Sequence, residues 1–429
     1  MGLQILSLCC LVGAIIFGFV KKTNVGVACL GLSLILGTIG GMSAGDIYKG
    51  FPYKLFLTLF GTMFFFSMLQ ENGTLEMVSG KLTSMCGKKL FLVPIIIYIV
   101  SFVLSAAGPG AISVQTVMVL FAVPLALQMG INPILMGAMA ILGAVGGTAS
   151  PIALTGIIVD DLLTEMGITG NGMQIFLGVT VANFICAVVT YIVFRGWKAG
   201  KEPAASGADK DMAQDTAAAK EPTKFGRKQI ISLVALLAMV IVVVGFSWDI
   251  GLVCLTLSLI LIILDAADEK KSLKNIPWGT LILIAGVNVL MNITQQLGGI
   301  QLLADLLASC MNSVTAAPIM GLTGGIMSWF SSANGVVFPT LIPTVPSIAE
   351  QVGGVSILQM VVAIVCSATV AGISPLSTGG SLVLASFCQE TEADAKAESG
   401  VFIRLFGLSA LCVLTVFILT LVGLLKFLG

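Results

Sequence analysis

The stretch ISPLSTGG (373–380) interrupts one of the most apolar parts of the chain, the segment 355–386. A helix that crosses a bilayer needs about 20 apolar residues at roughly 1.5 Å each. Here a proline, two serines, a threonine and two glycines stand in the middle of such a segment. Backbone groups released from a helix inside lipid are costly unless protein or ligand satisfies them. We therefore expect this break to serve a ligand.

Composition sets the class of protein. Of the 429 residues, 57% are hydrophobic and only 10% are charged, which predicts a polytopic all-α membrane protein. A net charge of zero gives no basic footprint for nucleic acid. The chain has no histidine, and we find no paired carboxylates or metal-binding cluster within the spans. An intramembrane enzyme is therefore not expected, and neither is a cofactor.

The apolar segments fall into two halves, 1–196 and 229–429, separated by the polar stretch 197–228. That stretch is rich in Ala, Lys, Asp and Glu, which predicts a flexible cytoplasmic linker. The first half is expected to contain helices within 3–71, a hairpin at 90–128, a broken helix at 133–159 and a helix at 172–195. The second half is expected to contain helices within 229–294, a hairpin at 315–348, the broken helix 355–386 and a helix at 401–428.

The basic residues predict the orientation. With the linker in the cytoplasm, 18 of the 21 Lys and Arg residues fall inside, and Lys49, Lys54 and Lys426 fall outside. Both termini are then expected outside, in the periplasm. Full crossing and re-entry of the two hairpins give the same parity, so both remain open.

The two halves repeat the same punctuation at a shift of about 222–226 residues. The matching motifs are QENGTL (70–75) with QQLGGI (295–300), SAAGPGA (105–111) with SSANGVV (331–337), and GGTASPIALTG (146–156) with AGISPLSTGG (371–380). With the predicted threading, matching segments cross the membrane in opposite directions. This pattern predicts an inverted-topology repeat, which is typical of secondary transporters.

Each half thus carries a hairpin with a glycine-rich or polar tip and a helix broken at mid-membrane. Broken helices expose N–H groups that suit carboxylates and carbonyl groups that suit small cations. Every basic residue lies at a segment end, so an anionic cargo would be neutralised by dipoles, hydroxyls and co-bound cations.

The segment FPYKLFLTLFGTMFFFSMLQENGTLEMVSGKL (51–82) resembles the N-terminal signature of MatC-type dicarboxylate carriers, with its Phe-Pro start and its Asn-Gly-Thr. The repeated hairpin and broken helix resemble the wider ion transporter superfamily, including the divalent anion/sodium symporters. This resemblance implies a homodimer of elevator carriers, in which both hairpins and both broken helices move together against a scaffold.

The symporters carry a Ser-Asn-Thr motif at each hairpin tip, where substrate carboxylates and Na⁺ bind. Here the second tip reads Ala333-Asn334-Gly335 and keeps only the Asn, while the first tip, Ala107-Gly108-Pro109, has none. The expected substrate-binding residues are Ser332, Asn334, Gly335, Ser374, Ser377, Thr378, Thr148 and Ser150. The expected cation-binding residues are Gly108, Pro109, Gly110, Gly147, Asn334 and Gly372, with Na⁺ as the one metal considered.

These observations predict a cation-coupled secondary carrier of small dicarboxylates, such as malonate, succinate or malate, in the bacterial inner membrane. The expected partners are the organic anion, Na⁺ or H⁺, the lipid bilayer and a second copy of the chain. The alternative is the same architecture with another cargo, as in a Na⁺/H⁺ antiporter or a monocarboxylate or sugar-acid permease. A channel is disfavoured because inverted repeats with broken helices are typical of alternating access.

Overall fold

The structure is a computed structural model that describes residues 2–21, 23–74, 77, 90–198, 226–246, 248–276, 278–391 and 395–424. These residues are helical or lie in turns and loops, and none forms a strand, which confirms the all-α class. Most of the expected linker 197–228 lies outside the described residues. Six segments in the described part are long and apolar enough to cross a membrane: Tyr53–Glu71, Gly110–Leu127, Gly172–Val193, Trp278–Gln296, Ile357–Cys388 and Lys396–Leu421.

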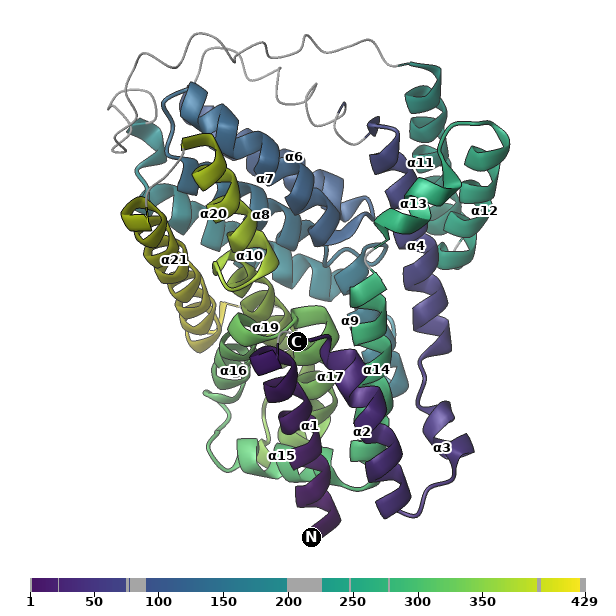
Figure 1. The fold of residues 1–429 in the computed structure, drawn as a ribbon. Coiled ribbons are helices and arrows are strands. Elements are labelled where there is room, and N and C mark those ends of the chain that lie inside the picture. The colour runs from purple at the N-terminus through teal and green to yellow at the C-terminus, as the bar shows by residue number, and fades with distance from the viewer. Residues whose placement is uncertain are drawn as a thin grey trace.

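The first four helices of each half follow one order, two long helices, a short one and a long one. In the first half they are α1 (Gly2–Lys21), α2 (Val25–Ile39), α3 (Ala44–Lys49) and α4 (Tyr53–Glu71). In the second half they are α11 (Arg227–Phe246), α12 (Ile250–Ile263), α13 (Glu269–Asn275) and α14 (Trp278–Gln296). The short helices α3 and α13 lie at opposite ends of the molecule, as an inverted repeat requires (Figure 1).

The hairpin and broken helix follow in both halves. The first half has η1 (Leu90–Leu92), α6 (Val93–Ala106), α7 (Gly110–Gln128), α8 (Pro133–Gly147), α9 (Leu154–Glu165), α10 (Gly172–Val193) and η2 (Gly196–Lys198). The second half has α15 (Gly299–Ala308), α16 (Ala316–Phe330), η4 (Ala333–Val337), α17 (Phe338–Leu341), η5 (Ile342–Thr344), α18 (Val345–Val352), α19 (Ile357–Val370), η6 (Ala371–Ile373), α20 (Thr378–Thr391) and α21 (Ala395–Leu421). Both expected breaks are present, at 148–153 and 371–377.

Glycine contacts show the repeat in three dimensions. Helix α2 crosses α14 where a side chain on Gly286 would come within 2.1 Å of the Gly26 carbonyl oxygen. Helix α12 crosses α4 where a side chain on Gly61 would come within 2.3 Å of the Gly251 carbonyl oxygen. In each half the two glycines occupy equivalent positions, about 225 residues apart. Only glycine permits such close crossings, so both halves use the same packing device.

A second symmetric contact joins the halves at the ends of α4 and α14. The Gln229 side-chain amide donates to the Asn72 carbonyl at 2.8 Å, and the Asn72 amide donates to Ser232 Oγ at 2.7 Å. At the equivalent place, the α1 side chains Gln4 and Ser7 lie against Gly298 and Gly299. The motifs QENGTL and QQLGGI therefore mark two symmetric clamps between the halves.

The sequence explains where both broken helices begin. Asn132 accepts hydrogen bonds from the Ile134 and Leu135 N–H groups and caps α8, and Pro133 occupies the first helical position. Ser356 accepts from the Gln359 N–H group and caps α19. The two caps stand about 224 residues apart, at equivalent positions of the repeat.

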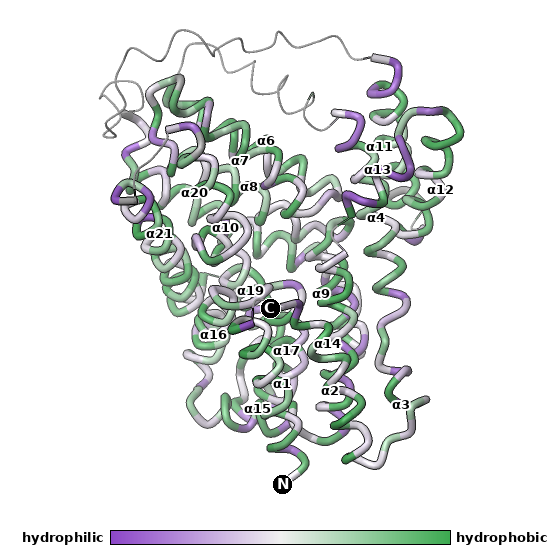
Figure 2. Tube along the Cα trace, in the orientation of Figure 1, coloured by the Kyte–Doolittle hydropathy of each residue, from purple (hydrophilic) through white to green (hydrophobic). Residues whose placement is uncertain are grey.

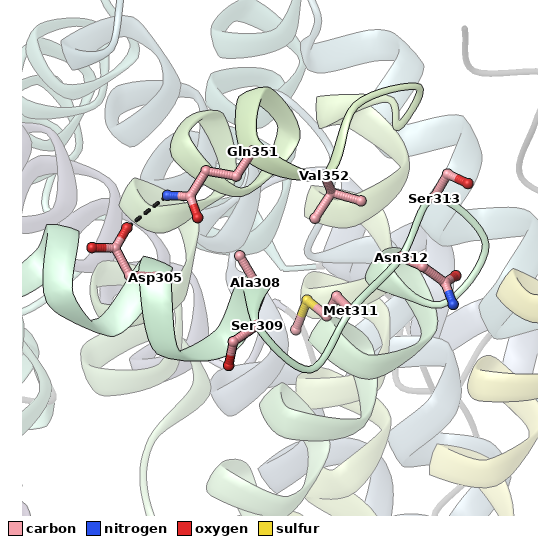
Figure 3. Close-up of a pocket in the computed structure, with 8 residues that line it drawn as sticks. All are labelled: Asp305, Ala308, Ser309, Met311, Asn312, Ser313, Gln351 and Val352. Carbon is pink, nitrogen blue, oxygen red and sulfur yellow. Dashed lines mark hydrogen bonds between the residues drawn. The ribbon is translucent and has the colours of Figure 1, made fainter.

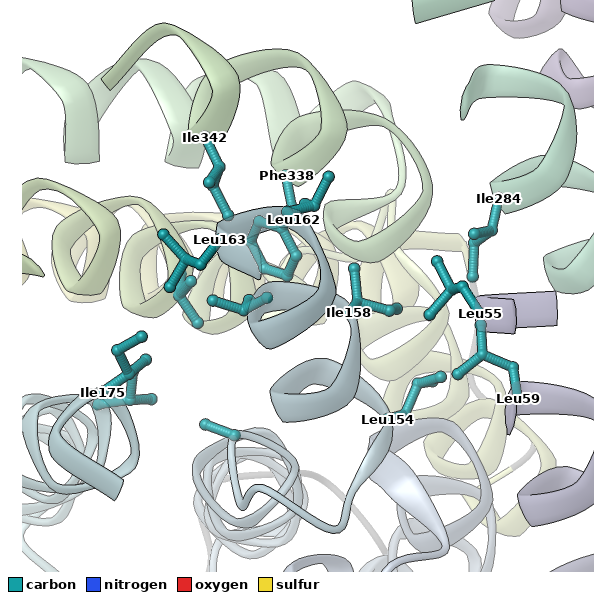
Figure 4. Packing of buried hydrophobic residues seen from close by; sticks show 14 of the residues in the cluster. Leu55, Leu59, Leu154, Ile158, Leu162, Leu163, Ile175, Ile284, Phe338 and Ile342 are labelled. Atoms are coloured by element: carbon teal, nitrogen blue, oxygen red, sulfur yellow. The ribbon is translucent and has the colours of Figure 1, made fainter. Parts of the chain in front are cut away.

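The apolar residues run along the helices, whereas hydrophilic residues gather at α13 and at the start of α11 (Figure 2). One large buried cluster joins α4, α9, α14 and the distal arm of the second hairpin (Figure 4). Its members include Leu55, Leu154, Ile158, Phe338 and Ile342. This cluster holds α9, which follows the first break, against the second hairpin.

Three details differ from the expected segments. The short helices α3, α13 and α15 replace expected connections, and α13 begins with the Asp268 side chain accepting from the Lys271 N–H group. Prolines at 339, 343 and 346 divide the distal arm of the second hairpin into short elements that reach Val352. Helix α21 begins at Ala395 rather than 401, which places Arg404 well inside this helix, on an exposed face.

Candidate functional site

The tip of the second hairpin reaches the first break. Ser332 caps the tip by accepting from the Gly335 N–H group at 3.2 Å. Thr155 Oγ1, at the start of α9, donates to Asn334 Oδ1 at 2.9 Å. Thr155 is fully buried, whereas Asn334 is half-buried. The predicted Asn334 is thus held at the first broken helix by Thr155, a residue that the sequence analysis did not single out.

The tip of the first hairpin lies on the same break. Gly108 has a φ of +132° and Gly110 a φ of +77°, and both values favour glycine. A side chain on Gly108 would come within 2.6 Å of the Phe66 ring, and one on Gly110 within 3.0 Å of Leu154. Thr148 Oγ1 lies 3.8 Å from the same position on Gly110. The two hairpin tips therefore converge on the first break.

The backbone of the first break is satisfied internally. The Gly156 N–H group donates to the Thr148 carbonyl at 3.1 Å, and the Ser150 N–H group donates to the Gly147 carbonyl at 3.0 Å. The Thr148 hydroxyl is different, because it is 1% exposed and has no hydrogen-bond partner in the described chain. Ser105, at the end of α6, has a hydroxyl in the same condition. Buried polar groups are rarely unpartnered, so these hydroxyls point to a ligand.

The second break is held by side chains from two other helices. Trp329 Nε1–H donates to Ser409 Oγ at 2.9 Å, and the Ser409 hydroxyl donates to the Ala371 carbonyl at 3.0 Å. The Ser377 hydroxyl donates to the carbonyl groups of Gly372 and Ser374. The predicted Ser377 therefore spends its proton on shaping the break.

The remaining predicted residues divide between three places. Ser374 Oγ accepts from the Leu376 N–H group at 3.3 Å, and Thr378 is exposed at the start of α20. Gly147 packs against α6, where a side chain would come within 2.2 Å of the Phe102 carbonyl oxygen. Gly372 has open space on its Cα side. Gly108, Pro109 and Gly110 with Thr148 thus form one group, Asn334 and Gly335 adjoin it through Thr155, and Gly372 belongs to the second break.

The site carries no fixed charge. Both tips and both breaks consist entirely of uncharged residues. Beyond the expected span, burial raises the pKa of the Asp161 carboxyl, Lys54 lowers it, and Asp160 raises it further. Charge selection at the tips and breaks must therefore come from hydroxyl groups, amides and helix ends.

A separate cleft of about 440 Å³ lies between α15 and α18 (Figure 3). Its lining residues are Asp305, Ala308, Ser309, Met311, Asn312, Ser313, Gln351 and Val352. The Gln351 amide donates to Asp305 at 2.6 Å across the cleft. None of the predicted site residues lines it, so it is distinct from the site at the tips.

The fold and this uncharged site at two broken helices define a multi-pass membrane transporter. Residues 14–337 match the family model described as "Citrate transporter" (CitMHS), and the chain belongs to this family. No curated protein matches the chain at a significant level. The crystal structure of the YdaH transporter of Alcanivorax borkumensis, described as having an unusual topology, aligns with a TM-score of 0.63 at 14% identity. The alignment covers 97% of this chain and 99% of the YdaH chain.

Family membership confirms the broader resemblance to ion transporters and the expectation of a transporter rather than an enzyme. The narrower resemblance to MatC-type carriers is not confirmed and stays a prediction. The similarity to the YdaH structure extends to the fold alone.

Proposed function

We propose that this protein is a cation-coupled secondary carrier of small dicarboxylates of the malonate, succinate and malate type. The observation that carries the proposal is the buried, unpartnered Thr148 hydroxyl at the place where both hairpin tips meet the first break. A carboxylate bound there would accept the Thr148 proton. It would also gain from the amide of Asn334, whose Oδ1 is already held by Thr155.

The charge of the cargo explains why coupling is needed. Moving a dianion into a cell against about 100 mV costs roughly 4.6 kcal/mol, at about 2.3 kcal/mol per charge. Two co-transported monovalent cations cancel this cost, and a third turns the potential into a driving force. An uncharged site is consistent with such coupling, because the neutralising charge arrives with the substrate.

The coupling ion is proposed to bind at the first tip. Gly108, Pro109 and Gly110 have backbone carbonyls that suit a small cation, and the Thr148 hydroxyl oxygen lies close to them. H⁺ is the alternative coupling ion. The tips and breaks hold no carboxyl group, so a coupling proton would need a group elsewhere, such as Asp161.

Alternating access is proposed to follow the elevator scheme in a homodimer of the bacterial inner membrane, with both termini outside. The two hairpins and the two broken helices would then move together against α4 and α14. The shared contacts of both tips with the first break support this scheme, because elements that share a binding site move as one body.

Citrate is the second candidate cargo, and the family description favours it. A third carboxylate raises the cost of entry to roughly 6.9 kcal/mol per 100 mV, so more cations would have to accompany citrate.

The test is uptake by purified protein in liposomes, with radiolabelled succinate, malonate or citrate outside. An inward Na⁺ gradient at fixed pH and a pH gradient without Na⁺ are imposed separately. Accumulation of one of these anions under one gradient supports the proposal. Absence of uptake of all three under both gradients overturns it.

A further inference from the structure

The second broken helix resumes at α20 with three unpaired donors. The backbone N–H groups of Thr378, Gly379 and Gly380 have no acceptor within the described chain, and the first bonded N–H is that of Ser381, to the Ser377 carbonyl. Side chains are excluded from two of these positions. A Cβ on Gly380 would lie 2.2 Å from the Ile373 carbonyl oxygen, and one on Gly379 would lie 2.8 Å from the Gly372 carbonyl oxygen. The first turn of α20 is therefore bare.

A buried side chain from the first hairpin points at this turn. Gln115 of α7 is 5% exposed, and its Oε1 lies 2.8 Å from the position of a Cβ on Gly379. The Gln115 amide forms no hydrogen bond within the described chain. A glutamine buried among apolar residues without a partner is costly, at about 1–3 kcal/mol. Its place beside a bare helix N-terminus indicates a shared ligand rather than a packing role.

The bare turn is also reachable. Thr378 and Ser381 on the first turn are exposed, whereas the first break is buried throughout. The N-terminus of a helix carries a partial positive charge and donates N–H groups, which together favour an anion. An amide N–H₂ beside it adds a donor for the second oxygen of a carboxylate. The donor set therefore fits one carboxylate group.

We propose that Gln115 and the N-terminus of α20 form a carboxylate subsite, and that Gln115 selects anions with more than one carboxylate. Gln115 follows Gly110 by five residues, which is about 7.5 Å along α7. One carboxylate at Thr148 and another at α20 are thus roughly a short carbon chain apart. A monocarboxylate fills only one of the two places. This inference rests on the proposed carboxylate transport.

The test compares KM and kcat for succinate and for lactate in liposomes. Gln115→Leu keeps the size of the side chain and removes the amide, so KM for succinate is expected to rise about 10–100-fold, as for loss of a hydrogen bond to a charged group. Its kcat and its KM for lactate change much less. Gln115→Glu is expected to raise KM for succinate further, because the new carboxylate repels the substrate. The control is Thr116→Val on the same helix, whose hydroxyl donates to the Ile112 carbonyl.

The outcomes separate the two proposals. If the wild-type protein transports no carboxylate, the proposed function fails and this subsite fails with it. If the wild type transports succinate while Gln115→Leu keeps its KM, only the subsite is wrong. Should Gln115→Leu fail to fold, Gln115→Asn retains the amide on a shorter side chain. A raised KM for succinate in that variant supports the subsite, and an unchanged KM overturns it.

Discussion

Thr148→Val separates a ligand-binding hydroxyl from a structural one. Valine has nearly the shape of threonine and lacks the hydroxyl, and the Thr148 hydroxyl has no partner in the described chain. A buried, unsatisfied hydroxyl costs about 1–3 kcal/mol, so its removal is expected to leave the free energy of unfolding unchanged or to raise it by up to that amount. Transport is expected to fall at least tenfold, because the substrate or cation loses this contact.

Thr148→Ser is the matched variant. It keeps the hydroxyl and removes one buried methyl group, which is expected to cost about 1 kcal/mol of stability. Transport is expected to stay close to wild type. Ser258→Ala in α12 is the control, because Ser258 is also buried and unpartnered but lies outside the tips and breaks. It is expected to leave transport unchanged.

The assay pairs thermal unfolding of the purified protein in detergent with initial uptake rates in liposomes. The reasoning predicts opposite effects for the two Thr148 variants: valine stable and inactive, serine less stable and active. A valine variant that loses more than about 1 kcal/mol of stability would show that the hydroxyl has a structural partner. A valine variant with normal uptake would remove Thr148 from the site.

Three further substitutions test the fold around the site. Asn72→Ala is expected to lower stability by about 2–3 kcal/mol, because Ser232 loses its partner, while the KM of the folded fraction stays unchanged; a melting temperature equal to wild type would contradict the clamp. Trp329→Phe removes one donor from the second break and is expected to cost about 1 kcal/mol in thermal unfolding, and no loss would show that the bond is dispensable. Gly108→Ala is expected to abolish uptake, since its side chain meets Phe66, and wild-type uptake would refute the tip geometry.

The repeat could be read from the sequence because both halves use the same breaks. The Ser-Pro pairs and the glycine-rich tips mark positions where a helix cannot continue, so their order was enough to predict the architecture. The short helices α3, α13 and α15 were not predicted. They are brief segments without a long apolar run, and local caps such as Asp268 on α13 define them.

The candidate site was predicted only in part. Asn334 and Thr148 were found because they lie within the breaks and tips. Thr155 and Gln115 were missed because their contacts join segments far apart in the sequence, Thr155 with Asn334 and Gln115 with Gly379. Gln115 did carry a signal, as an amide within the apolar arm of a hairpin. The assignment of Ser377 as a substrate ligand weakens for a related reason, because its hydroxyl is engaged by local carbonyls that sequence alone does not reveal.

One measurement tests the central claim most directly, namely uptake by wild type and Asn334→Ala side by side. Both proteins are reconstituted in liposomes at equal, verified amounts, and labelled succinate, malonate or citrate is supplied with an inward cation gradient. The account predicts that wild type concentrates one of these anions and that Asn334→Ala does not, although the variant remains folded. Equal accumulation by the two proteins would contradict the assignment of the site to the hairpin tips and the first break.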